Sequence, residues 1–134
     1  MDDIVVDTNI VIRYFTDPTL QSALAQSAIT KAQQSGASIY VPSIAIVELV
    51  YLIEKARIPG DVLFKLREAL DDSSTSFGLA ELSREVADEI ENIDRSIVGD
   101  MPDRIVVATA RHLDIPLVTS DGNIRKLSNV ETIW

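Results

Sequence analysis

Short runs of β-branched residues alternate with longer stretches whose apolar residues recur at helical spacing. The short runs predict strands over residues 4–6, 38–41, 77–80, 115–119 and 130–133. The longer stretches predict helices over residues 10–15, 20–35, 44–56, 61–70, 84–93 and 102–113, with one helical turn at 124–127. Strands separated by helices connect through right-handed crossovers, so the expected fold is α/β, a three-layer sandwich of about five parallel strands flanked by helices.

The pattern also predicts caps and buried positions. Ser43 is the expected N-cap of the apolar helix that follows it. In the second helix the apolar residues that recur at helical spacing are Leu20, Leu24, Ala28 and Ala32, with Ala25 and Ile29 beside them. Core packing is favoured, over a surface for a second copy or a partner protein, for the apolar residues Tyr51, Phe64 and Leu70.

The amino-acid composition excludes several classes of site. The chain of 134 residues fits a single domain, residues 1–134, and contains no cysteine and one histidine. Disulfides and a zinc site built from several Cys and His ligands are therefore excluded, and any bound metal must be held by oxygen. The acidic start does not resemble a signal peptide and no apolar run is long enough to span a bilayer, so we expect a cytoplasmic protein.

The net charge of −9 opposes a nucleic-acid partner, because phosphate contacts require Lys and Arg. Part of the acidic excess forms a run between residues 81 and 94, which is interpreted as a solvated helix face. Basic residues close in sequence to acidic motifs are candidates for phosphate contacts, although solvation or pairing with acids explains them equally well: Arg13, Arg104, Arg125 and Lys126. The only histidine, His112, is assigned no catalytic role.

Four acidic residues occupy positions where a parallel sheet gathers ligands. Asp7 and Asp121 follow predicted strands, and the carboxyl ends of parallel strands meet at one edge. Asp103 lies in the first turn of a predicted helix, and Glu48 lies on an apolar helix where a carboxylate needs compensation for its charge. Converging carboxylates with almost no nitrogen or sulfur donors select Mg²⁺ or Mn²⁺. Such an ion supports hydrolysis of a phosphodiester.

These residues lie within four motifs that resemble, in order, the acidic motifs of PIN-domain nucleases: residues 5–10 (VVDTNI), 43–50 (SIAIVELV), 103–110 (DRIVVATA) and 117–121 (LVTSD). The resemblance covers the whole chain, and its small one-domain form is similar to the VapC-type toxins of toxin–antitoxin pairs. It implies a five-stranded parallel sheet, Mg²⁺- or Mn²⁺-dependent cleavage of RNA, a homodimer, and inhibition by an antitoxin whose tail enters the catalytic groove.

Carried over by motif, the resemblance implies a metal-binding core of Asp7, Glu48 and Asp103, with Asp121 as a fourth, more variable acid. Asp100 lies one turn before Asp103 and competes with it, but the Ala-Thr-Ala that follows favours Asp103. The supporting hydroxyl and amide groups are those of Thr8, Asn9, Thr119 and Ser120.

Each acid also has an ordinary structural interpretation. Asp7 and Asp121 are typical turn residues, Asp103 is typical of a helix N-terminus, and Glu48 fits an exposed helix face. Three other functions stay open: a PIN-like nuclease of RNA processing outside a toxin–antitoxin pair, a non-catalytic interaction module, and a phosphoacceptor signalling domain. The phosphoacceptor domain is disfavoured because its acidic pair is expected directly after the first strand, whereas Asp2 and Asp3 precede that strand here.

Overall fold

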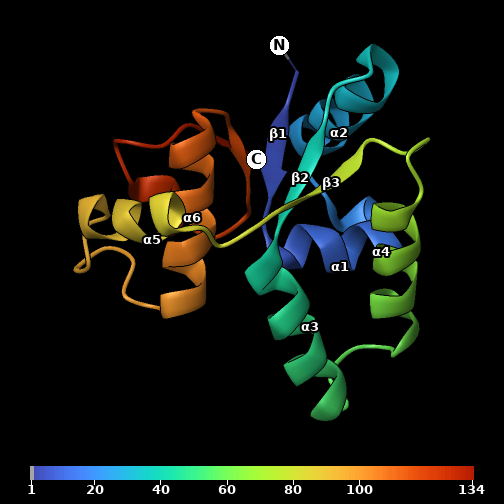
Figure 1. The fold of residues 1–134 in the computed structure, drawn as a ribbon. Helices are drawn as coiled ribbons and strands as arrows, with labels where there is room; N and C mark the ends of the chain where they lie inside the picture. The colour runs from blue at the N-terminus through green and yellow to red at the C-terminus, as the bar shows by residue number, and fades with distance from the viewer. Residues whose placement is uncertain (1) are drawn as a thin grey trace.

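A computed structural model describes residues 2–134 and contains one five-stranded sheet in which every pairing is parallel. The strands lie in the order β3-β2-β1-β4-β5 (Figure 1). Their bounds are Ile4–Val6 (β1), Ile39–Pro42 (β2), Phe77–Ala80 (β3), Leu117–Val118 (β4) and Thr132–Ile133 (β5). The expected α/β fold with five parallel strands is confirmed, although β4 and β5 are shorter than the strands predicted at 115–119 and 130–133.

Helices cover both faces of this sheet. Figure 1 shows α5 and α6 to the left of the sheet, α1 and α4 to its right, and α3 below it. None of the helices within residues 2–134 combines the length and apolar character needed to cross a membrane. Their bounds are Thr8–Thr16 (α1), Ala23–Ser35 (α2), Ser43–Glu54 (α3), Asp61–Asp71 (α4), Arg84–Glu89 (α5) and Met101–Leu113 (α6), with 3-10 turns at Pro18–Leu20 (η1), Ile90–Asn92 (η2) and Ile124–Lys126 (η3).

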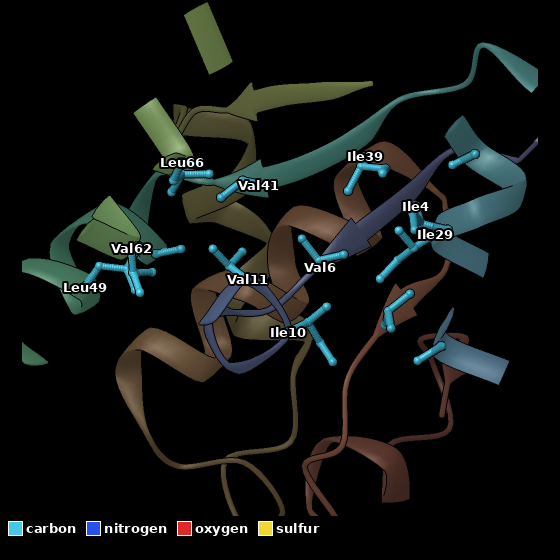
Figure 2. Close-up of a cluster of buried hydrophobic side chains, with 14 residues drawn as sticks. Ile4, Val6, Ile10, Val11, Ile29, Ile39, Val41, Leu49, Val62 and Leu66 are labelled. Carbon is cyan, nitrogen blue, oxygen red and sulfur yellow. The ribbon is translucent and has the colours of Figure 1, made fainter. Parts of the chain in front are cut away.

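The central strands supply both layers of the core because successive strand residues face opposite sides. Ile4 and Val6 pack with α1 to α4, whereas Val5 packs with α5 and α6. In β4, Val118 belongs to the first cluster and Leu117 to the second. Figure 2 shows the first cluster, in which strand side chains face those of the helices, among them Val11, Ile29, Leu49, Val62 and Leu66. Burial on both faces explains why these strands read as continuous apolar runs.

The strand order reverses between β1 and β4. From β1 the chain proceeds through β2 to β3 on one side, and it then returns to add β4 and β5 on the other side. Val5 pairs with Leu117 and Val6 with Val118, so the two strands end at the same level. In open parallel sheets this reversal leaves a crevice at the carboxyl ends of the two strands, which is where ligands bind.

Two predictions about helices are wrong. Ser43 is not an N-cap: the cap position of α3 is Pro42, and the Ser43 hydroxyl accepts a hydrogen bond from the Leu82 N–H at 3.1 Å. The buried stripe of α2 consists of Ala25, Ile29 and Ala32, whereas Leu24 is 64% exposed. The helix predicted from residue 20 starts at Ala23, because residues 18–20 form a separate 3-10 turn.

The preference for core packing is also wrong for two of the three apolar residues. Tyr51 on α3 and Phe64 on α4 are 59% and 63% exposed, and Leu70 alone packs against the core. Val47, one turn before Tyr51, is exposed as well. The outer faces of α3 and α4 therefore carry apolar side chains in contact with solvent.

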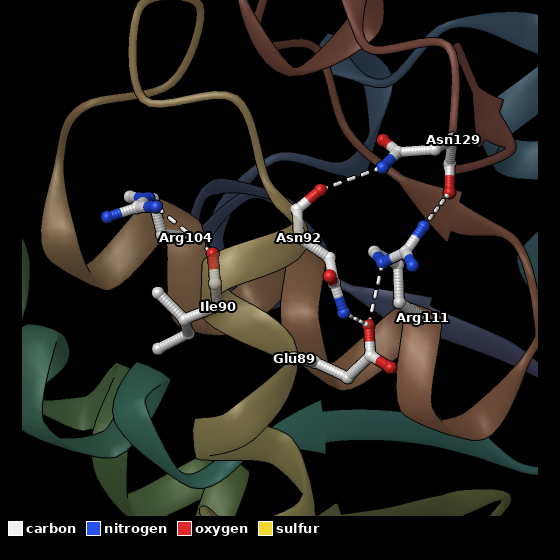
Figure 3. A network of polar contacts seen from close by, with 6 residues as sticks. All are labelled: Glu89, Ile90, Asn92, Arg104, Arg111 and Asn129. Atoms are coloured by element: carbon white, nitrogen blue, oxygen red, sulfur yellow. Dashed lines mark hydrogen bonds and ion pairs between the residues drawn. The ribbon is translucent and has the colours of Figure 1, made fainter.

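Polar contacts attach α5 and the loop before β5 to α6 (Figure 3). The Arg111 Nε donates to Glu89 Oε2 at 2.8 Å, and its Nη1 donates to the Asn129 carbonyl at 2.6 Å. The Arg104 Nη2 donates to the carbonyls of Ile90 and Ile93, each at 3.0 Å. Arg104 therefore satisfies two carbonyls around η2 with its Nη2, which gives this side chain a structural role.

Replacing Arg104 with methionine keeps the aliphatic stem but leaves both carbonyls without their donor. We expect Arg104→Met to lower the free energy of unfolding by about 1–3 kcal/mol in urea denaturation. The matched control is Arg84→Met, because Arg84 forms an exposed pair with Asp88 at 3.6 Å. That change should cost no more than about 0.5 kcal/mol. Equal losses for the two variants would contradict the structural role of Arg104.

Candidate active site

The first acid lies directly after β1, at the strand-order reversal. Asp7 is the N-cap of α1, and its Oδ1 accepts the Ile10 N–H at 3.0 Å. Its Oδ2 accepts the hydroxyl hydrogen of Thr119, which follows β4. Asp7 is only 7% exposed. One oxygen of Asp7 thus has an ordinary structural role as a helix cap. The other oxygen faces the end of the neighbouring strand.

The second acid reaches the same place from α3. Thr8 Oγ1 donates to Glu48 Oε1 at 2.6 Å, which joins the start of α1 to the middle of α3. Glu48 is half-buried. The apolar character of α3 predicted a buried surrounding for this carboxylate, but Val47 and Tyr51 on the same helix are exposed. The carboxylate therefore lies at the boundary between the apolar core and solvent.

The third acid lies at the start of α6, as predicted. Asp100 is the N-cap of this helix, and its Oδ2 accepts the Asp103 N–H at 3.2 Å. The two acids are therefore adjacent but have different roles, since Asp100 fixes the helix start and Asp103 lines the pocket described below. Sequence reasoning treated Asp100 only as a competitor for the site and missed its capping role, which its position before Met101-Pro102 could have indicated.

The fourth acid shapes the turn after β4. Asp121 Oδ1 accepts the N–H groups of Asn123 and Ile124 at 2.9 and 3.0 Å. Its own N–H donates to Thr119 Oγ1 at 3.1 Å. Thr119 thus donates to Asp7 and accepts from Asp121, so that one buried hydroxyl connects two of the four acids.

All four acids line one small pocket of about 200 Å³. Two of the predicted supporting residues, Thr8 and Asn9, line it as well. The other two lie at its border, where Thr119 donates to Asp7 and Ser120 accepts a hydrogen bond from Arg13 Nη1 at 3.1 Å. The structure therefore brings every predicted site residue to one end of the sheet. The pocket is lined by Asp7, Thr8, Asn9, Glu48, Leu52, Asp103, Val106 and Asp121.

The pocket concentrates negative charge that no cation within it offsets. Burial raises the pKa of Asp103 to about 7, and the charges of Asp100, Asp121, Glu48 and Asp7 contribute to the rise. Burial likewise raises the pKa of Asp7, against the lowering effects of the Thr119 and Ile10 hydrogen bonds and of Arg13. The pKa of Glu48 is raised by burial and by neighbouring acids, although the Thr8 hydrogen bond lowers it.

The donor chemistry of the pocket fits a hard divalent cation. Carboxylate, hydroxyl and amide oxygens surround it, and no basic side chain is among the residues that line it. As placed, however, no three acidic or histidine side chains of residues 2–134 lie at metal-ligating spacing. Asp7 and Glu48 each accept a threonine hydroxyl. A bound cation would have to compete with these hydroxyl groups.

Arg13 is the basic side chain that the structure places beside this pocket. Its guanidinium lowers the pKa of Asp7, and its carbon Cζ lies 5.4 Å from the centroid of the Trp134 ring. Sequence reasoning named Arg13 as one of four candidates and did not single out Trp134. Arg125 and Lys126 are exposed, and His112 is exposed on α6.

The raised pKa of Asp103 predicts a measurable pH effect on stability. Between the ordinary value of 3.8 and about 7, the folded protein holds a proton at Asp103 that the unfolded chain has released, so stability decreases as pH rises through this range. In chelator, Asp103→Asn should therefore raise the melting temperature at about pH 8, and the gain should fade as pH decreases towards 4.

The matched control for this prediction is Asp88→Asn, which alters an exposed carboxylate on α5. It should show no gain that grows with pH. An Asp103→Asn protein that is less stable than the unmodified protein at alkaline pH would show that the fold does not raise the pKa of Asp103.

The fold is shared with solved structures at low sequence identity. A chain of the DNA-bound VapBC structure from Salmonella typhimurium matches with a TM-score of 0.72 at 14% identity, covering 98% of this chain and 97% of that chain. A chain of the promoter-bound VapBC2 structure from Rickettsia felis matches with a TM-score of 0.71 at 16% identity, covering 97% and 96%.

A chain of a toxin–antitoxin complex from Klebsiella pneumoniae matches with a TM-score of 0.62 at 21% identity, covering 95% of this chain and 94% of that chain. A comparison with curated protein sequences found no match. The comparison with protein families matches the PIN domain over residues 4–130, nearly the whole chain. The resemblance read from the four acidic motifs is therefore confirmed, and the chain belongs to the PIN domain family.

Proposed function

We propose that the protein is a Mg²⁺- or Mn²⁺-dependent endoribonuclease that acts in the cytoplasm as the toxin of a toxin–antitoxin pair. The observation that carries this proposal is the convergence of Asp7, Glu48, Asp103 and Asp121 on one pocket at the carboxyl ends of β1 and β4. Membership of the PIN domain family supports nuclease activity. The fold similarity to chains of VapBC complexes supports the toxin assignment.

The pocket residues divide into ligands and groups that orient them. Asp7, Glu48 and Asp103 would hold the cation, with Asp121 as a fourth acid. When bound, the cation would orient a water for attack on phosphorus and neutralise charge on the leaving oxygen. Thr119 and Thr8 fix the rotamers of Asp7 and Glu48 through their hydrogen bonds. The exposed Asn9 side chain at the pocket has amide hydrogens to donate to a phosphate oxygen.

A phosphoacceptor signalling domain is not supported. Doubly wound signalling domains of that kind have the strand order 2-1-3-4-5. The order found here places β3 at one end of the sheet and β1 at its centre. Asp100 caps a helix and does not end a central strand. A PIN nuclease outside a toxin–antitoxin pair remains the nearest alternative, and a non-catalytic module requires an explanation for four converging acids.

The proposed partners are RNA as substrate, an antitoxin protein and a second copy of the chain in a homodimer. The exposed apolar side chains of Val47, Tyr51 and Phe64 supply surface for a protein partner. Their exposure removes the reason for assigning Tyr51 and Phe64 to the core. The structural similarity to chains in toxin–antitoxin complexes supports the antitoxin.

Ribonuclease activity is tested with labelled single-stranded RNA and Mn²⁺. The protein should cut the RNA internally, and chelator should stop the reaction. Asp7→Asn and Glu48→Gln should each slow cleavage by roughly 100-fold or more, because the pocket charges that position the reaction are removed. Asp88→Asn, the surface control on α5, should cut at the unmodified rate. Cleavage that persists in chelator, or in Asp7→Asn, would falsify the proposed mechanism.

The toxin assignment makes a separate prediction in cells. Expression of the protein alone should stop growth of a bacterial host, since unregulated RNA cleavage depletes essential transcripts. Asp7→Asn should restore growth at an equal protein level, and so should co-expression of a short protein encoded next to the gene. Undisturbed growth with an active ribonuclease would instead favour a role in RNA processing.

A further inference from the structure

A second hollow, of about 400 Å³, lies beside the edge strand β5. Asp3, which precedes β1, and Trp134, which follows β5, both line it. Because the strands are parallel, these residues mark opposite ends of the sheet, and the hollow spans its full height. We call it the β5 groove, and its lining includes Leu24, Ala28, Lys31, Arg125, Ile133 and Trp134.

Direct contacts join the β5 groove to the acidic pocket. Trp134 carries the Arg13 guanidinium against its ring. Arg13 Nη1 donates to the Ser120 hydroxyl, and the next residue along the chain, Asp121, lines the acidic pocket. Ser120, Arg13 and Trp134 therefore form a continuous series of contacts from the border of the acidic pocket to the β5 groove.

The basic residues along this path are free of carboxylate partners. Among the described residues, the three ion pairs engage Lys65, Arg84 and Arg111, and none engages Lys31 or Arg125. Lys31 and Arg125 therefore keep their positive charge unpaired in a chain whose net charge is −9. Cations beside an acidic catalytic pocket supply the attraction for phosphate that the pocket itself lacks.

The indole ring adds a contact of a different kind. Trp134 is half-buried, packs against the first core cluster and also lines the β5 groove. Aromatic side chains in basic grooves bind single-stranded nucleic acid because every base can stack on them, whereas the bases of a duplex are already stacked. The size of the groove lies within the range of about 300–1,000 Å³ that holds small organic ligands, and a nucleoside belongs to that class.

Two acids in the β5 groove oppose phosphate, and they share its far end with Lys31, because the end of α2 leads into the start of β2. Asp2 and Asp3 precede β1, at the end of the sheet opposite Trp134. The Asp3 carboxylate accepts the Ser38 N–H at 2.8 Å, which fixes it in a structural contact. The end of the groove nearest the acidic pocket therefore combines the indole with Arg13.

We propose that the β5 groove binds a single-stranded segment of RNA next to the cleavage site, with a base on Trp134 and phosphates at Lys31 and Arg125. This inference rests on the proposed function for its choice of RNA, and it deepens that function by naming where the substrate is held. An acidic peptide of a partner protein is the competing occupant, because it would satisfy the same cations.

Trp134 is the only tryptophan in the chain, so its fluorescence reports on the β5 groove alone. The unmodified protein is titrated with a single-stranded RNA oligonucleotide in chelator, which prevents cleavage. We expect saturable quenching of Trp134 by single-stranded RNA and little quenching by a duplex of the same sequence. Poly-L-glutamate should leave the fluorescence unchanged. Quenching by poly-L-glutamate alone would identify a peptide site and overturn the proposal.

Charge variants test the phosphate contacts. Lys31→Gln with Arg125→Gln should raise the dissociation constant for labelled RNA roughly 10-fold, and the slope of log K against log salt should fall by about 0.7 for each phosphate that is no longer neutralised. The matched control is Lys55→Gln with Arg57→Gln, which removes the same charge from exposed positions after α3. Equal weakening of RNA binding in both double variants would show that only the net charge of the protein matters, and it would overturn the proposal.

Substitution of the indole completes the test. Trp134→Leu should weaken binding of labelled RNA, measured by anisotropy, by roughly 5-fold or more, and Trp134→Phe should restore part of the affinity. RNA cleavage without quenching of Trp134 would overturn the proposed role of the β5 groove but would leave the proposed nuclease activity standing. Quenching that depends on Lys31 and Arg125 in a protein that cuts nothing would support the groove and remove the proposed function.

Discussion

Burial of several carboxylates in one small pocket is the constraint on which the functional end of this molecule depends. Folding brings Asp7, Glu48, Asp103 and Asp121 together although each would be better solvated alone. The raised pKa values of Asp7, Glu48 and Asp103 express that cost, to which burial contributes most and the neighbouring acids add. Core packing on both faces of the sheet must outweigh it. A site of this kind stores unfavourable electrostatic energy until a cation relieves it.

The surroundings of the pocket limit the repulsion without removing it. The hydroxyl groups of Thr8 and Thr119 donate to Glu48 and Asp7, and Arg13 stands beside Asp7. None of these groups neutralises the pocket, since hydroxyls carry no charge and Arg13 is also engaged with Ser120 and Trp134. The same arrangement leaves Arg13 at the junction between the acidic pocket and the β5 groove, where an incoming polyanion would meet positive charge first.

Much of this architecture was predictable because periodicity and acid placement follow local rules. The predicted bounds of the strands β1, β2 and β3 and of the helices α4 and α6 lie near the observed ones, and the convergence of the four acids follows from parallel strands ending together. The errors arose where tertiary contacts decide. The Ser43 hydroxyl bonds a distant N–H in place of its own helix, and Tyr51 and Phe64 face solvent because α3 and α4 bury their other sides. Nothing local in the sequence indicates that Arg104 bonds the carbonyls of Ile90 and Ile93.

The alignment of β1 with β4 has a wider consequence. Asp7 and Thr119 each come directly after the last residue of their strand, so the pairing of Val6 with Val118 alone brings them level. Their meeting does not depend on the length of the long stretch of chain between them. Loops and outer helices can lengthen, shrink or change composition without displacing the chemistry, provided that two short stretches keep their alignment. Adaptation to new partners can therefore proceed on the periphery of the molecule while its centre stays unaltered.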